Sequence, residues 1–164
     1  AAARDIFLLS YYLGGMNLID LLAYDFRKPD LDYIRHKTRN TKHGDSRTVF
    51  AIQPEARAII DRYMDKKTGL LVLPFGNNFR TKVSFINRSI KETAKNVGVK
   101  RRVSPYTARK SFVQHGFDIG ISLETLEYCI GQSMKSNRPI FNYLKIMRQH
   151  ADVAIRTILD ELAK

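Results

Sequence analysis

The stretch from Ser104 to Tyr143 constrains the fold most, because two helix starts and their ends follow one another closely there. Ser104 followed by Pro105 is typical of an N-cap with proline at the first helical position. Ser122 is suited to cap a second helix, and Gly131 is suited to end it. The sequence therefore predicts two helices, followed by a polar loop that leads to Tyr143.

The first of these helices starts with side chains suited to an anion. Tyr106 and Arg109 are three residues apart and so share one face, close to a helix start with unpaired N–H groups and a partial positive charge. Lys110 adds a second cation. We expect a phosphate seat that needs no metal, on a helix that ends in a turn at Gly116 and Gly120.

The net charge of the chain favours a polyanionic partner. Its 164 residues include 28 Lys and Arg against 16 Asp and Glu, which gives a net charge of +12 and a pI near 10.0. A compact domain with this charge attracts nucleic acid. General solubility or a ribosome-associated role would explain the same charge, so the motifs have to decide.

The single cysteine, Cys129, lies in an apolar run and is expected to be a small buried residue. No disulfide or zinc framework is then possible, and a reducing cytoplasm is expected. No run approaches the roughly 18 apolar residues of a membrane span, and no signal peptide is present. The opening Ala-Ala-Ala leads directly into a helical pattern, as in a piece of a longer protein.

Apolar periodicity predicts the remaining elements. Further helices are expected over 4–14, 16–22, 54–66, 79–96 and 147–162. A hairpin is expected from strands 31–37 and 47–52, with a possible third strand over 70–73. The predicted fold is mainly α with a small antiparallel β-sheet at one edge.

Three short motifs lie at the spacing of a known family. They read Tyr106-Thr-Ala-Arg109, Ile130-Gly131-Gln132 and Phe141-Asn-Tyr143-Leu144. This arrangement resembles the catalytic domain of the tyrosine recombinases, or phage-type integrases, which have a His-x-x-Arg box, a Leu-Gly-His box and a nucleophilic tyrosine. Tyr106 stands where the family usually has histidine, and Gln132 where it has histidine or tryptophan.

The resemblance implies that Tyr143 attacks a DNA phosphodiester and holds the strand as a 3′-phosphotyrosyl ester, with no metal or cofactor. Arg109 would bind the phosphate as the second of the family's two arginines. Tyr106 and Gln132 would each donate a hydrogen bond. Taken singly, Tyr106 would be a half-buried aromatic, Gln132 a loop residue and Tyr143 a core or interface residue.

The family also has a lysine on a hairpin, which protonates the leaving 5′ oxygen. The matching residue is Lys37, in the sequence Arg35-His36-Lys37-Thr38, with Lys42 in reserve. Without the flanking match, either lysine could equally be a solvated side chain that touches phosphate non-specifically.

Further basic residues are expected to bind the DNA backbone. Lys100, Arg101 and Arg102 form the densest basic run and lead directly into the proposed phosphate seat. An isolated run of this kind would usually be a solvated face, but its position favours backbone contact. Lys42 and Lys110 are the other candidates.

The first arginine of the family is missing. Asn17 stands in its place, where it is suited to cap a helix, although Asp20 matches the acid that follows in the family. Loss of a preorganised donor costs on the order of 3 kcal/mol of transition-state stabilisation. Either the protein is weak or another cation enters, with Arg27, Arg35 and Arg39 as candidates; we favour replacement by one of these.

The predicted function is therefore that of a site-specific DNA recombinase of a mobile element. Residues 1–164 would be its catalytic domain, separate from the amino-terminal DNA-binding domain that the family usually carries. It would bind double-stranded DNA, assemble as a tetramer on it and work with accessory DNA-bending proteins. Its last helix would pack on its own domain or in a neighbour's groove.

Three other functions compete with this one. A non-catalytic DNA-binding protein of the same fold would explain the replaced side chains. A basic RNA-binding protein lacks glycine-aromatic signatures and would bind structured RNA at least as well as duplex DNA. A metal-dependent nuclease is poorer, because the four histidines show no ligand spacing and the paired acids read as exposed helix charges.

Overall fold

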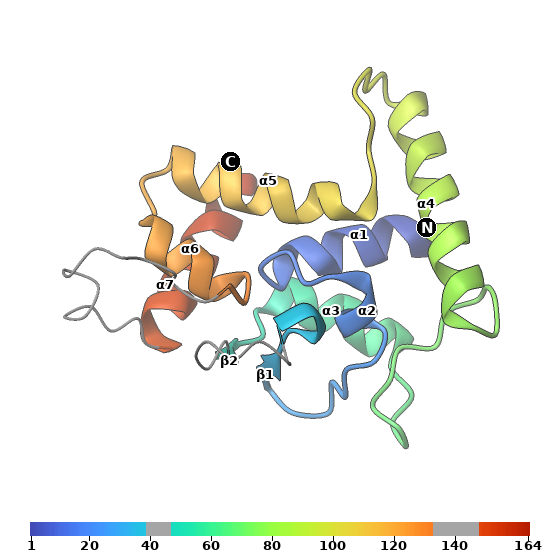
Figure 1. Ribbon diagram of the computed structural model, residues 1–164, viewed down its shortest axis with the longest axis horizontal. Helices are drawn as coiled ribbons and strands as arrows, with labels where there is room; N and C mark the ends of the chain where they lie inside the picture. Colours follow the sequence, from blue (N-terminus) through green and yellow to red (C-terminus); the bar gives the residue numbers. More distant parts are fainter. Residues whose placement is uncertain (39–46, 133–147) are drawn as a thin grey trace.

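The computed structural model describes residues 1–38, 47–132 and 148–164 (Figure 1). Within these ranges the fold is mainly helical, with one two-stranded antiparallel sheet, as predicted. The helices are α1 (Ala2–Tyr12), α2 (Leu18–Leu21), α3 (Pro54–Tyr63), α4 (Phe79–Asn96), α5 (Pro105–Asp118), α6 (Leu123–Cys129) and α7 (Arg148–Leu162). The strands are β1 (Asp30–Ile34) and β2 (Arg47–Ala51), and a 3₁₀-helix, η1 (His36–Thr38), follows β1.

Helix α1 forms the centre of the core. Its residues Ile6 and Leu9 are completely buried, and the helix packs against α3, α4 and α5. Figure 1 shows α5 along one side of α1 and α3 on the other. The dense apolar pattern of this segment, too broad for a surface helix, is explained by these neighbours on several sides.

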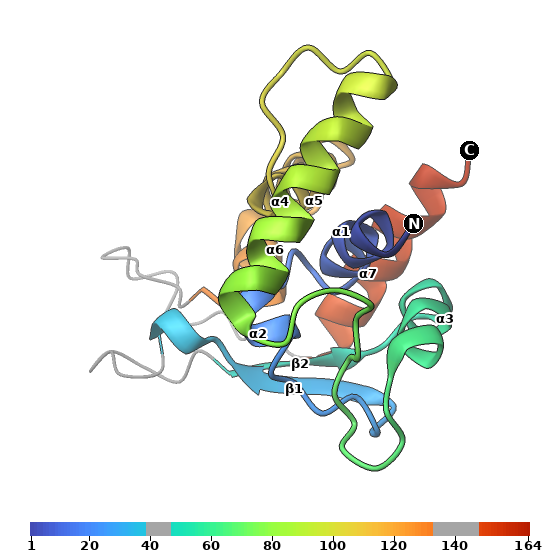
Figure 2. The same cartoon turned by 90° about the vertical axis from the view of Figure 1, so that its right-hand side faces the viewer.

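The sheet lies at one edge of the molecule (Figure 2). In its register Leu31 pairs with Phe50 and Tyr33 with Thr48. Alternate residues point inward, so Leu31 and Tyr33 are buried while Asp32 is exposed.

The first predicted strand, 31–37, was too long. It ends at Ile34, because the N–H group of His36 donates to the Asp20 carboxylate at 2.9 Å and the chain turns into η1. The predicted strand over 70–73 is reduced to a single bridge between Met64 and Leu71.

The predicted helix starts at Ser104 and Ser122 and the predicted helix over 79–96 are confirmed. The predicted turn at Gly116 is wrong, because α5 continues to Asp118. A Cβ atom at Gly116 would lie 2.5 Å from a Leu126 methyl carbon and 3.0 Å from one of Ile158. Gly116 therefore lets other helices pack closely against α5.

Helix α7 buries its apolar stripe in its own domain, against β2, α6 and α5. Ala151, Ala154, Ile155, Ile158 and Leu159 are buried, whereas the sixth residue of the stripe, Leu162, is half exposed. Ionic contacts hold the helix as well: Arg156 pairs with Glu55 at 2.6 Å.

Cys129 is buried in this core, as predicted, and burial raises the pKa of its thiol to about 12. Among the described residues, no helix combines the length and the apolar character that crossing a membrane requires.

Candidate active site

Arg109 lies in the first turns of α5, where it is buried with only 3% of its surface exposed. Its Nη1 donates to the carbonyl oxygen of Gly15 at 3.1 Å, and its Nη2 donates to that of Ile130 at 2.6 Å. These bonds join three parts of the chain: the start of α5, the turn after α1 and the turn after α6. The guanidinium is therefore held in a fixed orientation.

Gly15 is the residue that allows this close packing. Its φ of +73° is in the left-handed region that favours glycine. A Cβ atom at this position would lie 2.6 Å from the Cα atom of Arg109. Any other residue would push Arg109 and the turn apart.

A second arginine, Arg35, is buried close to the first. It directly follows β1 and continues the alternation of Leu31 and Tyr33, so its side chain faces inward and only 7% of it is exposed. The surrounding donors assign the Asn17 amide an orientation with its oxygen towards Arg35, in which that oxygen accepts hydrogen bonds from Nη2 at 3.0 Å and Nε at 3.1 Å. The buried guanidinium is thus oriented from the start of α2.

This contact corrects the predicted role of Asn17. The residue does stand at the N-cap position of α2, but its side chain makes no capping hydrogen bond there. A buried guanidinium without an acceptor is costly, and Arg35 is only 7% exposed. Asn17 therefore binds Arg35.

The two arginines are close enough to influence each other. Burial lowers the pKa of Arg109, and the positive charge of Arg35 lowers it further. Tyr33 and Tyr106 partly offset the effect. The site thus concentrates positive charge where water does not screen it well.

Asp20 lies at the border of the same cluster. Besides the bond to His36, its second oxygen is buried without a hydrogen-bond partner in the described part of the chain, as is the hydroxyl oxygen of Tyr33. Burial raises the pKa of the Tyr33 hydroxyl, and the Asp20 carboxylate raises it further. The charges of Arg109 and Arg35 act on the same hydroxyl in the opposite direction, so Tyr33 and Asp20 lie close to the two arginines.

The turn from Ile130 to Gln132 lies against these arginines. Gly131 adopts φ of +69°, and a Cβ atom there would lie 3.6 Å from both the Arg35 Cβ and the Tyr33 hydroxyl. The backbone N–H of Gln132 donates to the Glu127 carbonyl at 2.9 Å, and the residue is exposed. Gln132 is thus placed two residues from the carbonyl that Arg109 holds.

Tyr106 lies at the surface beside Arg109. It is 49% exposed, and the Lys110 Nζ atom is 5.6 Å from the centre of its ring. A cavity of about 280 Å³ opens between the starts of α2 and α5, with Asn17, Ser104 and Tyr106 in its lining. The start of α5 is therefore accessible from outside.

The remaining predicted residues differ in what the structure says of them. Lys100, Arg101 and Arg102 are exposed in the segment that leads into α5. Lys37 is exposed on η1, two residues after Arg35, and its proximity to Arg109 stays a prediction. Tyr143, Lys42 and Arg39 lie outside the described residues.

Comparisons with known proteins agree with the motifs. The chain is 27% identical to the tyrosine recombinase XerA of Saccharolobus solfataricus over 79% of its length. It is 24% identical to XerD of Lacticaseibacillus casei over 86%, and 21% identical to XerC of Chlamydia pneumoniae over 83%. The chain is a relative of the tyrosine recombinases.

This relationship covers part of each relative. The chain spans about half the length of most of the curated tyrosine recombinases that it matches, for example 42% of XerA and 50% of XerD. No model of a protein family matches the chain, and no solved structure matches it.

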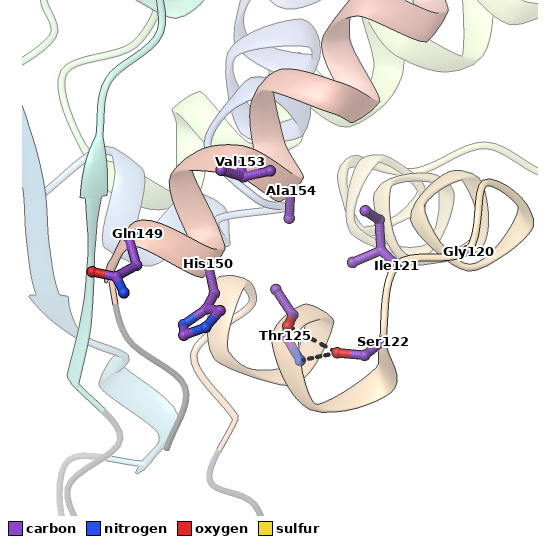
Figure 3. A pocket seen from close by; sticks show the side chains of 8 residues that line it. All are labelled: Gly120, Ile121, Ser122, Thr125, Gln149, His150, Val153 and Ala154. Carbon is purple, nitrogen blue, oxygen red and sulfur yellow. Dashed lines mark hydrogen bonds between the residues drawn. The ribbon is translucent and has the colours of Figure 1, made fainter. Parts of the chain in front are cut away.

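A second cavity, of about 350 Å³, lies apart from these residues, between the start of α6 and helix α7 (Figure 3). Its lining includes Ser122, the N-cap of α6, Thr125 from α6, and His150 and Val153 from α7. None of the residues that match the tyrosine recombinase motifs is among them. In the described ranges no group of three or more His, Cys, Asp or Glu residues is arranged to hold a metal ion.

Sequence reasoning did not foresee the contact between Asn17 and Arg35, nor the burial of Tyr33 beside the two arginines. One signal was present: Leu31, Tyr33 and Arg35 occur at every second position and so fall on one face of a strand. That spacing could have placed Arg35 inside the domain. It could not have identified Asn17 as its partner.

Proposed function

We propose that this protein is the catalytic domain of a site-specific DNA recombinase or integrase, over residues 1–164. It cuts and rejoins DNA through a 3′-phosphotyrosyl intermediate. One observation carries the proposal: Arg109 is fixed and buried between Gly15 and Ile130, beside the accessible Tyr106. The motif that ends at Arg109 and the motif Ile130-Gly131-Gln132 are thus joined by one hydrogen bond, from Arg109 to the Ile130 carbonyl.

In the proposed reaction the Tyr143 phenol loses its proton to solvent as its oxygen attacks phosphorus, and the bond to the 5′ oxygen breaks. Lys37 gives a proton to that oxygen, so a free 5′ hydroxyl results. Arg109 meets the charge that develops on the phosphoryl oxygens, while Tyr106 and Gln132 donate hydrogen bonds to them. The phosphotyrosyl bond keeps the energy of the broken bond, so a 5′ hydroxyl can later reverse the step.

Double-stranded DNA is the proposed partner. The net charge of +12 supports this, as does the exposed run of Lys100, Arg101 and Arg102 in the segment that leads into α5. Lys110 and Lys42 are proposed to extend the contact along the backbone. We further propose a cytoplasmic protein of a mobile element that acts as a tetramer on DNA with accessory bending proteins.

A covalent adduct tests the catalytic proposal. The purified protein is incubated with a pool of nicked duplexes of randomised sequence, so that the experiment also selects the target sequence. Adducts that survive denaturation are isolated and their DNA is sequenced. We expect an enriched sequence with wild type and no adduct with Tyr143→Phe, while Tyr12→Phe, in α1, keeps wild-type yield. Adduct formation by Tyr143→Phe would refute the proposed nucleophile.

The alternative is a DNA-binding protein of the same fold that no longer cleaves. Asn17 in place of the family's first arginine favours it. It predicts tight binding of duplex DNA with no adduct on any sequence of the pool. Structured RNA is the comparison ligand, because equal or tighter binding of RNA would instead point to an RNA-binding protein.

A further inference from the structure

We infer that Arg35 supplies the second phosphate-binding arginine of this site, from the end of β1 instead of the start of α2. This inference rests on the proposed function, because it names the group that replaces a missing part of the same site. Asn17 then acts as a positioning residue for Arg35.

The first argument is position. Arg35 and Asn17 are in contact, so the guanidinium reaches the place on the chain where the family has its first arginine. Its Cβ is also close to Gly131, whose neighbour Ile130 is bound by Arg109. Both arginines therefore border the same turn.

The second argument is charge. Two guanidinium groups that are 3% and 7% exposed, and that repel each other, raise the energy of the folded protein. Asp20 is a carboxylate close to the same cluster, where its charge raises the pKa of Tyr33 while Arg109 and Arg35 lower it. An anion between the arginines would relieve this repulsion, and the phosphoryl group of DNA is the anion that the proposed reaction brings.

The third argument is fixation. An isolated buried arginine could adopt several rotamers, but Asn17 holds Arg35 through Nε and one terminal nitrogen. A guanidinium carries five N–H donors, so binding along one edge is compatible with phosphate binding along another. Preorganised donors of this kind stabilise a transition state best.

The other candidate cations differ in position. Arg27 precedes β1, at the opposite end of the strand from Arg35, and is exposed. Its guanidinium binds the Asp25 carboxylate and the Lys67 carbonyl. Arg39 lies outside the described residues. Arg27 is therefore a suitable control for Arg35.

The deciding experiment measures how duplex binding depends on salt, in the Tyr143→Phe background so that no covalent step contributes. Each phosphate contact contributes about 0.9 to the slope of log K against log [salt]. We expect Arg35→Gln to reduce the slope by about one and Arg27→Gln to leave it unchanged. An unchanged slope for a folded Arg35→Gln protein would overturn the inference. This readout does not depend on catalysis, so absence of any adduct would refute the proposed function alone.

Adduct formation then tests the role in catalysis. We expect Arg35→Gln to lower the rate of adduct formation about 10²- to 10³-fold, as Arg109→Gln does, with Arg27→Gln near wild type. The double variant Asn17→Arg, Arg35→Asn returns the charge to the start of α2. It should recover at least tenfold over Arg35→Asn alone, which a merely structural role of Arg35 does not predict.

Because Arg35 is buried, its substitution can also unfold the protein. Thermal melting of each variant identifies such unfolding, and Arg35→Lys provides a variant that keeps the charge but not the planar fork of donors. We expect Arg35→Lys to keep the salt slope while adduct formation falls. A folded Arg35→Lys protein with wild-type adduct rate would contradict the proposed geometry.

Discussion

Gly15 and Arg109 contact each other in two ways. The glycine carbonyl accepts a hydrogen bond from Arg109 Nη1 at 3.1 Å, and the site of its absent Cβ lies 2.6 Å from the Arg109 Cα. The left-handed φ of Gly15 makes both possible. The position of the central arginine is therefore set by a residue that carries no side chain.

Gly15→Ala should displace Arg109. We expect a loss of about 1–3 kcal/mol in the free energy of unfolding, and at least a tenfold lower yield of covalent adduct. Gly98→Ala is the matched control, because Gly98 has a φ of +79° but no atom within 4 Å of its added Cβ. It should lose about 1 kcal/mol from backbone strain alone and keep its adduct yield. Equal adduct loss in both variants would show that strain, and not Arg109, is responsible.

Lys37→Ala should slow cleavage about 10²- to 10⁴-fold if its ammonium protonates the leaving 5′ oxygen. A substrate with sulfur in place of that oxygen tests this role, because a thiol, with a pKa near 8.5, leaves without needing a proton. We expect the sulfur substrate to restore cleavage by Lys37→Ala. Lys100→Ala weakens only DNA binding and should gain nothing from sulfur. If Lys37→Ala remains equally slow on both substrates, the lysine is not the acid.

Asp5 should make stability depend on pH. Burial alone would raise the pKa of this carboxyl group, but hydrogen bonds from Tyr63, Arg62 and Arg4 outweigh it and hold the pKa below its usual 3.8. A lowered pKa stabilises the fold above the unfolded value, and this contribution is lost as pH falls through the folded value. Asp5→Asn should therefore cost about 1–3 kcal/mol at pH 7 and progressively less as the pH falls through the folded pKa.

Urea unfolding of the wild type and Asp5→Asn between pH 2.5 and about 7 measures this difference. Asp61→Asn, at an exposed position of α3, is the control and should stay within about 0.5 kcal/mol of wild type. If the loss in free energy of unfolding caused by Asp5→Asn is the same in acid, the effect comes from packing and hydrogen-bond geometry and not from the charge of the carboxylate.

Helix α7 should contribute to stability through its inner face. Ile155 is completely buried, so Ile155→Ala should cost about 2–4 kcal/mol. Val153, two residues before it, is 67% exposed, and Val153→Ala should cost less than about 0.5 kcal/mol. Thermal or chemical unfolding of the two variants measures both values. Similar small costs would mean that α7 is docked only loosely on its own domain.

Local signals in the sequence predicted much of the fold. Ser104 followed by Pro105 located the start of α5, Ser122 that of α6, and the apolar period over 79–96 located α4. Such signals act within a turn or two of chain, through caps, proline geometry and the facing of apolar side chains. They were enough to place Arg109 near a helix start and to suggest the family.

Contacts between distant segments had to come from the tertiary structure. In the sequence Arg27, Arg35 and Arg39 were equal candidates for the missing charge, and Gly116 read as a turn. Packing placed Arg35 against Asn17 and placed Gly116 beneath Leu126 and Ile158. These outcomes depend on how β1 lies against α2 and how α6 and α7 cross α5. The sequence by itself determined the elements and the kind of chemistry, whereas the tertiary structure decided which side chains share the site, because their proximity arises only when the core closes.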